Sequence, residues 1–316
     1  MIHRLPKHKL IEVLEAATPE QEWVLDTETN GLEVIGHSPA HYAWWVGLSP
    51  LGSHNVFIVS MDEYWEWGLE AWFKKLRLVG HNLRFDLHAM DLVPEVPWRD
   101  TIVAAYYGHT SGKRSMDHFA KVNGWHNIET PDELKQGRIA DLPEERLFEY
   151  LANDCILTSK MAMRFRMDEC LLDYKVEQAV YAMERKGIRL LLDRFHVVEH
   201  ELEEIIEERL HTLHREGLTG NPDSPSQVAE WLLSRNRKLP HTATGKPSTA
   251  KLVLQQLADG GDALAEAVIQ YRKATKLKSG FIAPLPKLAQ DGMFYPRTNT
   301  TRTRTGRFSC DSPNLQ

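Results

Sequence analysis

Hydrophobic and polar positions in the first half of the chain follow two patterns. Short apolar runs bounded by Gly, Pro, Ser or Asn are typical of β-strands, whereas residues 63–76 carry large apolar side chains at helical spacing. The apolar runs lie at 23–25, 43–48, 55–59 and 78–80. Mixed strands and helices over about the first 170 residues predict an α/β domain.

The strongest helix prediction begins at Pro143 and covers residues 143–163. Proline and two acids occupy its first turn, where proline and negative charge are favoured. The helix carries Tyr150 and Asp154, which are four residues apart and therefore share one face.

After residue 174 the strand signals fade and helical patterns dominate. Residues 176–186 predict a helix that ends at Gly187, and residues 264–282 predict another. Residues 194–216 predict a long amphipathic helix with one buried stripe. That stripe consists of Val197, Val198, Leu202, Ile205, Ile206, Leu210 and Leu213. We therefore expect the second half to be mostly α-helical.

The amino-acid composition limits the classes of protein to which this chain can belong. A chain of 316 residues predicts two or three domains, and 42% apolar with 26% charged residues is ordinary for a globular protein. Three scattered cysteines argue against a disulfide or zinc framework. No apolar run follows the basic first residues, and no stretch approaches membrane-spanning length. We therefore expect a cytoplasmic protein without membrane contact.

Charge is distributed unevenly along the chain. The net charge of −6 gives no overall basic footprint, yet residues 271–309 contain nine basic residues and a single acid, Asp291. A basic tail on an acidic body predicts a polyanionic partner. The alternative is a solvated basic end.

Two carboxylates follow the first of the apolar runs. Asp26 and Glu28 are spaced i, i+2, so in a strand they point to the same side at its carboxyl end. Like charges this close raise each other's pKa unless a cation neutralises them, and oxygen-rich clusters suit Mg²⁺ or Mn²⁺. Such a pair is common on surface strands, so a metal site requires further acids. Asp86, at a strand-to-helix junction, and Asp154 are the candidates.

The three acidic segments resemble the exonuclease motifs of the DEDD superfamily, tyrosine subclass, found in the proofreading domains of DNA polymerases. Motif I matches residues 25–32, motif II residues 80–86 and motif III residues 150–154. The resemblance implies an α/β, RNase H-like exonuclease domain over residues 1–172, with a mixed central sheet flanked by helices.

Later segments resemble family A (DNA polymerase I-like) DNA polymerases. The matching segments are residues 181–188 (the helix and turn joining exonuclease to polymerase), 221–233 (thumb tip), 271–277 (thumb-to-palm helix), and 305–309 with 313–316 (a specific family A signature). This implies a mostly α-helical linker and partial thumb over residues 173–292. Residues 293–316 would then be the start of a truncated palm-like segment.

The residue at which the sequence ends leads to an expectation about polymerase activity. In family A the palm's two catalytic aspartates and the fingers helix lie beyond the Asn-Leu-Gln of that signature, and this sequence ends at Gln316. We therefore expect the N-terminal part of a split or truncated polymerase, without polymerase activity in this chain alone. A second chain carrying palm and fingers is a candidate partner.

The resemblance also implies two bound divalent cations, Mg²⁺ or Mn²⁺. Asp26 would bridge both, Glu28 and Asp154 would complete the first site, and Asp86 would hold the second. Tyr150, together with Glu28, would orient the attacking water, because a phenol with a pKa near 10 is a poor base at neutral pH.

Further residues are predicted to contact the substrate. By resemblance, Asn82 would steady the site and Leu32 would wedge against the terminal base of a single strand. Arg272 and Lys276 are interpreted as phosphate contacts, with a solvated helix face as the alternative. Arg307 resembles the family's arginine at the primer-terminal minor groove.

These observations predict a metal-dependent 3′→5′ DNA exonuclease of the proofreading type. Its partners would be the single-stranded DNA 3′ end and primer–template DNA, and its products 5′-mononucleotides. Two alternatives remain open: a non-autonomous DNA-binding polymerase subunit, and an RNA-trimming exonuclease of the same superfamily.

Overall fold

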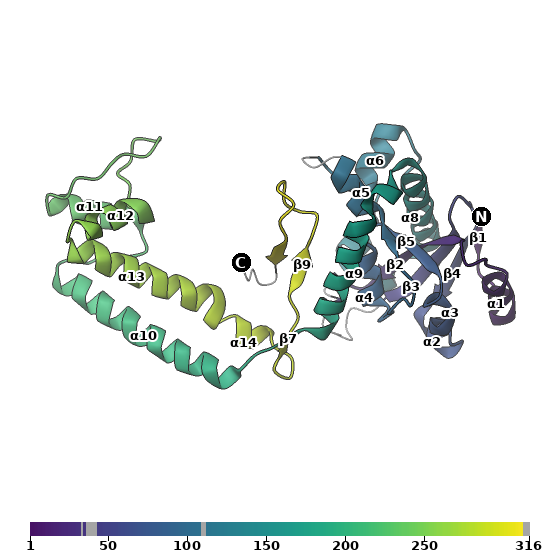
Figure 1. Cartoon of the computed structure of the whole chain (residues 1–316), viewed down its shortest axis with the longest axis horizontal. Helices are drawn as coiled ribbons and strands as arrows, with labels where there is room; N and C mark the ends of the chain where they lie inside the picture. The colour runs from purple at the N-terminus through teal and green to yellow at the C-terminus, as the bar shows by residue number, and fades with distance from the viewer. Residues whose placement is uncertain (33, 36–42, 109–111, 312–316) are drawn as a thin grey trace. The chain divides into compact units, whose positions relative to one another are not determined.

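A computed structural model describes residues 1–32, 34–35, 43–108 and 112–311 (Figure 1). The chain divides into two compact units. The first unit comprises Met1–Gly187 together with a segment that starts at Tyr295, and the second comprises Ile188–Phe294. The compact units change after Gly187 and after Phe294, and the C-terminal segment belongs to the first unit. The domain boundaries expected at 172 and 292 stay predictions. Residues 313–316 of the family A-like signature lie outside the described residues.

A six-stranded mixed sheet forms the centre of the first unit. Its strand order is β1-β4-β3-β2-β5-β6. The strands are β1 (Ile2–His3), β2 (Glu22–Thr29), β3 (Ala43–Pro50), β4 (Val56–Ser60), β5 (Arg77–Gly80) and β6 (Arg99–Asp100). The β2–β3 and β3–β4 pairs are antiparallel, whereas β1–β4, β2–β5 and β5–β6 are parallel. The predicted α/β class with a mixed sheet is confirmed.

Helices cover both faces of this sheet. They are α1 (Lys7–Glu15), α2 (Met61–Glu66), α3 (Glu70–Phe73), α4 (Leu83–Ala89), α5 (Thr101–Gly108), α6 (Met116–Asn123), α7 (Asp132–Lys135), α8 (Glu144–Arg164) and α9 (Leu171–Lys186). The 3₁₀ turns Ile139–Asp141 and Met167–Cys170 precede α8 and α9. Side chains alternate along β2: Val24 packs with Leu151 of α8, and Leu25 packs in the core on the opposite face.

Close contact between α8 and the sheet depends on Gly47 in β3. A Cβ atom there would lie 2.9 Å from the Sγ atom of Cys155 and 3.0 Å from Leu151 Cγ. Because only glycine leaves this space, α8 lies directly against the face that carries Asp26.

The single helix predicted for residues 63–76 is wrong. The structure has two short helices, α2 and α3, separated by Gly68 with φ of +67°. The apolar spacing continues through this turn, but a left-handed glycine ends the first helix.

The second unit is mostly helical, as predicted. It contains α10 (Leu192–Arg215), α11 (Pro225–Ser234), α12 (Lys251–Asp259), α13 (Ala263–Leu277), a π-helical turn (Lys278–Ile282) and α14 (Leu285–Leu288). The short strands β7 (Ile188–Arg189) and β8 (Met293–Phe294) pair in antiparallel fashion where this unit begins and ends. Its core includes Leu213, Trp231, Leu232 and Val268.

The predicted buried stripe of α10 is confirmed only in part. Leu202 and Leu213 are buried, whereas Val197 is 52% exposed and Ile205 38% exposed. The helix packs on α13 and the π-helical turn, and these elements cover a narrower strip than the sequence periodicity suggests.

The C-terminal segment of the first unit forms a β-hairpin. Strands β9 (Arg297–Asn299) and β10 (Ser309–Asp311) pair in antiparallel fashion, and β9 lies beside α9 (Figure 1). Within the part of the chain that the structure describes, no helix is both long and apolar enough to cross a bilayer.

Candidate active site

Strand β2 and helix α8 bring three carboxylates together. Asp26 and Glu28 point to the same face of the sheet and pair across to Gly47 and Trp45 of β3. Asp154 reaches them from α8, which covers that face. One carboxylate oxygen from each of the three acids lies within 4.8 Å of the others, and all three side chains are buried.

Asp86 approaches the same strand from α4. Its Oδ1 atom accepts hydrogen bonds from the backbone N–H of Thr27, at 3.0 Å, and from the Thr27 hydroxyl, at 2.7 Å. Because Thr27 lies between Asp26 and Glu28, Asp86 is tied to the segment that carries both acids. It lies outside the tight group of three, yet its charge raises the pKa of Asp26 and of Glu28.

The electrostatics of this cluster disfavour negative charge. Burial, followed by repulsion from the neighbouring carboxylates, raises the pKa of Asp26 and of Glu28 well above their usual ranges. Burial also raises the pKa of Asp86 to about 8, against the lowering effect of its bonds from Thr27. The pKa of Asp154 rises to about 7 for the same reason, opposed by hydrogen bonds from Tyr150 and Asn153.

Among the described residues, none of these four carboxylates takes part in an ion pair with a basic side chain. Four buried acids without a counter-charge are unfavourable as anions in a low-dielectric site. Carboxylate oxygens are the preferred ligands of Mg²⁺ and Mn²⁺. The donor set therefore fits hard divalent cations, with the buried group of three as its centre.

Tyr150 lies one helical turn before Asp154 on α8. Its hydroxyl is 3.1 Å from the Thr130 hydroxyl and also hydrogen-bonds to Asp154. Burial and the nearby acids raise its pKa, so the phenol keeps its proton at neutral pH. In this state it can donate a hydrogen bond and cannot act as a base.

A pair of residues at the end of β6 holds the turn that leads into α4. The two carboxylate oxygens of Asp100 accept from the backbone N–H groups of Asn82 (2.9 Å), Leu83 (2.8 Å) and Ile102 (2.9 Å). The Thr101 hydroxyl donates to the Gly80 carbonyl at 3.1 Å. Asp100 and Thr101 are almost completely buried. We call these two residues the Asp-Thr clasp.

The clasp fixes an unusual backbone conformation. Asn82 has φ of +68°, a left-handed value for a residue with a side chain, and it directly precedes α4. The hydroxyl of Thr101 also lies 2.8 Å from Nδ1 of His81. Asp100 caps α5 through its bond from Ile102 and also caps α4, the helix that carries Asp86. Its second role, at α4, depends on tertiary contact and leaves no local signal.

The predicted substrate contacts fall in both units. Leu32, just after β2, is 73% exposed, and Arg307 is exposed in the first unit. Lys276 is exposed on α13. Arg272 donates from Nε to the Pro222 carbonyl and from Nη1 to the Thr249 carbonyl, each at 2.8 Å. These bonds hold the half-buried guanidinium against two other segments of the second unit, and its contact with phosphate stays a prediction.

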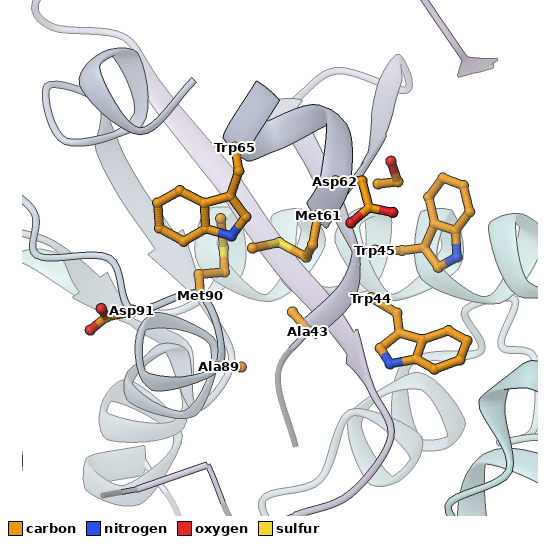
Figure 2. A pocket seen from close by; sticks show the side chains of 10 residues that line it. Ala43, Trp44, Trp45, Met61, Asp62, Trp65, Ala89, Met90 and Asp91 are labelled. Carbon is orange, nitrogen blue, oxygen red and sulfur yellow. The ribbon is translucent and has the colours of Figure 1, made fainter. Parts of the chain in front are cut away.

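A surface pocket on the first unit lies apart from the acids. Figure 2 shows this pocket, of about 530 Å³, with Trp65 and Met61 from α2, Met90 after α4, and Trp44 from β3. None of the four site carboxylates is among its lining residues.

Comparisons with known proteins show similarity to DNA polymerases. The sequence profile of DNA polymerase family A matches residues 192–316. DNA polymerase I of Borreliella burgdorferi is 27% identical over 336 aligned positions, covering 98% of this chain and 36% of that protein. DNA polymerase I of Synechocystis is 30% identical over 58% of this chain and 20% of its own length. The thermostable DNA polymerase I of Thermus aquaticus is 47% identical over 75 residues, which is 23% of this chain.

Solved structures agree at the level of the fold. The POL domain of Pol1 from M. smegmatis, in complex with DNA primer–template and dNTP, matches with a TM-score of 0.75 at 17% identity. That match covers 100% of this chain and 55% of the other. The chain thus spans about a third or less of the length of these curated relatives. The similarity to the Borreliella protein nevertheless extends along almost all of this chain, and residues 192–316 match the model of DNA polymerase family A.

Proposed function

We propose that this chain is a divalent-metal-dependent 3′→5′ DNA exonuclease of the proofreading type. One observation carries the proposal: Asp26, Glu28 and Asp154 converge within 4.8 Å in a buried site, with Asp86 beside them and no basic partner within the described ranges. A cluster this costly in folding energy needs a compensating ligand. The relationship to DNA polymerases makes DNA the expected substrate.

The carboxylates would hold the metal, with Asp26 at the centre of the cluster and Asp86 on the α4 side. When bound, paired divalent cations lower the pKa of water and stabilise negative charge on a phosphodiester. Glu28 and Tyr150 would orient the water for attack on the terminal phosphodiester. The protonated phenol of Tyr150 would donate a hydrogen bond there, since its raised pKa prevents it from accepting the proton.

Selection of an unpaired 3′ end would come from the residues around the cluster. Exposed Leu32, just beyond β2, offers an apolar surface for the terminal base. Asn82, held by Asp100 in its left-handed conformation, presents an amide near the start of α4. Unpairing a matched terminus costs a few kcal/mol, so frayed or mismatched ends would be preferred.

The hairpin loop of the first unit supports DNA binding independently. Arg302, Arg304 and Arg307 are all exposed on residues 300–308, between β9 and β10, and Nη1 of Arg302 pairs with Oδ2 of Asp311. The other two cations, Arg304 and Arg307, favour contact with phosphates. This feature also suits the alternative of a DNA-binding polymerase subunit that works with a second chain, and the two proposals are compatible.

The test is shortening of a 5′-labelled single-stranded oligonucleotide in Mg²⁺ or Mn²⁺, compared with EDTA. We expect a ladder of progressively shorter products with metal and none with EDTA. An RNA oligonucleotide of the same sequence distinguishes DNA from RNA trimming. Glu145→Gln is the matched control for acid variants, because it removes an exposed carboxylate from α8, the helix that carries Asp154. Full-length substrate after incubation with either metal would rule the proposal out.

A further inference from the structure

A second cluster of buried charges lies between α4 and α9. Glu177 and Glu184 of α9 are 4% and 1% exposed. From α4, Arg84 lies 3.4 Å from each of these carboxylates, and Nε2 of His88 lies 3.0 Å from Oε2 of Glu184. We call these four residues the α4–α9 ion cluster.

Arg84 and His88 do not supply enough close hydrogen bonds for the buried carboxylate oxygens of Glu177 and Glu184. At 3.4 Å the contacts of Arg84 are ion pairs rather than close hydrogen bonds. One guanidinium also faces two carboxylates, so close donors are still needed to satisfy the buried oxygens.

The C-terminal segment supplies these donors. The backbone N–H of Thr298 donates to Oε1 of Glu184 at 2.7 Å, and the hydroxyl of Thr300 donates to Oε1 of Glu177. In return, Nη2 of Arg84 donates to the Thr298 carbonyl at 2.5 Å. Thr298 lies 114 positions after Glu184 and 214 after Arg84, and Thr300 lies 123 after Glu177, yet all belong to the same compact unit.

Helix α4 connects this cluster to the candidate active site. It has only seven residues, with Arg84 and His88 facing α9 and Asp86 bonded to Thr27 of β2. A two-turn helix moves as one body, so a change on its α9 side shifts or loosens the Asp86 carboxylate.

We propose that residues 297–300 form part of the support of the nuclease site, with Thr298 and Thr300 as positioning residues that act on α4 through Glu184 and Glu177. This inference rests on the proposed exonuclease function. It means that the segment resembling the start of the polymerase palm also sets the geometry of the metal-binding acids. The nuclease then depends on the C-terminal hairpin, although no acid of the site lies there.

Three full-length variants test this dependence. Thr300→Val removes the hydroxyl at nearly constant shape, and Thr300→Ser restores it. Thr212→Val is the matched control, because the Thr212 hydroxyl bonds to the Glu208 carbonyl within α10 of the second unit, at 2.9 Å, and not to α9. We expect Thr300→Val to raise the Mn²⁺ concentration for half-maximal shortening by about 10-fold, the usual scale for a residue that supports a metal ligand. Thr300→Ser and Thr212→Val should match the parent protein.

A second readout does not depend on catalysis. Amide hydrogen exchange of residues 83–90 should be faster in Thr300→Val than in Thr212→Val, because α4 has lost part of its support. A double variant with Glu177→Gln should be no worse than Glu177→Gln alone, since Thr300 acts through that carboxylate. If Thr300→Val only reduces the overall stability, it should lower the melting temperature. The Mn²⁺ dependence of shortening, measured well below the melting temperature, should then be unchanged.

The outcomes separate this inference from the proposed function. If the parent protein does not shorten DNA, the exonuclease proposal fails, and the exchange measurement still tests the support of α4. If the parent shortens DNA and Thr300→Val has the parental metal dependence and the parental exchange of α4, the inference is wrong.

Discussion

Two clusters of buried acids lie on either side of α4, and they are built in opposite ways. In the α4–α9 ion cluster, Glu177 and Glu184 are matched by Arg84 and by donors from His88, Thr298 and Thr300. At the end of β2, burial raises the pKa of all four site carboxylates, and the neighbouring acids raise the pKa of Asp26 and Glu28 further; none of the four has a basic partner among the described residues. Buried acids that are matched by a basic side chain and by hydrogen-bond donors indicate a structural role. Buried acids without a basic partner indicate a site suited to a cation.

The largest effect expected from this contrast is on catalysis. Asp26→Ala should reduce the rate of DNA shortening by at least about 10³-fold, because it removes the central carboxylate of the proposed metal site. The rate of 3′ shortening in saturating Mg²⁺ measures this. Glu145→Gln should retain the parental rate; equal activity of Asp26→Ala and Glu145→Gln would show that the β2 cluster does not perform the chemistry.

Opposite effects on stability are expected from one acid of each cluster. Glu184→Gln should lower the free energy of unfolding by about 3 kcal/mol, because it breaks a buried ion pair and leaves Arg84 poorly matched. Asp154→Asn in EDTA at pH 8 should instead raise it by about 1 kcal/mol or more, because it removes a carboxylate whose pKa is already raised to about 7. Urea unfolding of both variants provides the values. If both variants lose a similar free energy of unfolding, the two clusters do not differ in how their buried acids are compensated.

A smaller effect is expected from the Asp-Thr clasp. Thr101→Val leaves the Gly80 carbonyl without its donor and should lower the shortening rate about 10-fold, whereas Thr101→Ser keeps the hydroxyl and should stay near the parental rate. In an Asp86→Asn background the same change should have little further effect, because the clasp acts through α4. If the effects of Thr101→Val and Asp86→Asn on the shortening rate are fully additive, the clasp contributes only to general stability.

The smallest expected effect is a pH dependence of the melting temperature. The acids of the β2 cluster have folded-state pKa values above their unfolded values, so the folded protein binds more protons than the unfolded chain. Stability in EDTA should therefore fall as the pH rises from about 5 through 8, by a few degrees, and Mn²⁺ should oppose the fall. Asp100, with a pKa raised to about 7, contributes in the same direction. A melting temperature that rises over this range in EDTA would contradict these shifts.

Local patterns predicted the parts of the site that lie within single elements. The i, i+2 spacing of Asp26 and Glu28 and the i, i+4 spacing of Tyr150 and Asp154 follow from strand and helix geometry, and both elements are confirmed. The convergence of these elements was expected from family resemblance, because sequence periodicity carries no information on which helix covers which strand.

Other features depend on contacts between distant residues and could not be predicted. The second role of Asp100 joins residues 17 and 18 positions apart, and the bonds of Glu177 and Glu184 to the C-terminal segment span more than 110 positions. In the sequence these two glutamates look like ordinary polar positions of a helix, yet both are buried. Likewise, the helical spacing of residues 63–76 concealed the turn at Gly68.

The most direct test of the account is calorimetric titration of the metal-free protein with Mn²⁺ at pH 7.5. We predict saturable binding by the parent protein and by Glu145→Gln, and binding at least about 10-fold weaker by Asp26→Ala. Equal Mn²⁺ affinity of all three proteins, or no saturable binding by the parent, would contradict the claim that the carboxylates of β2, α4 and α8 form a metal site.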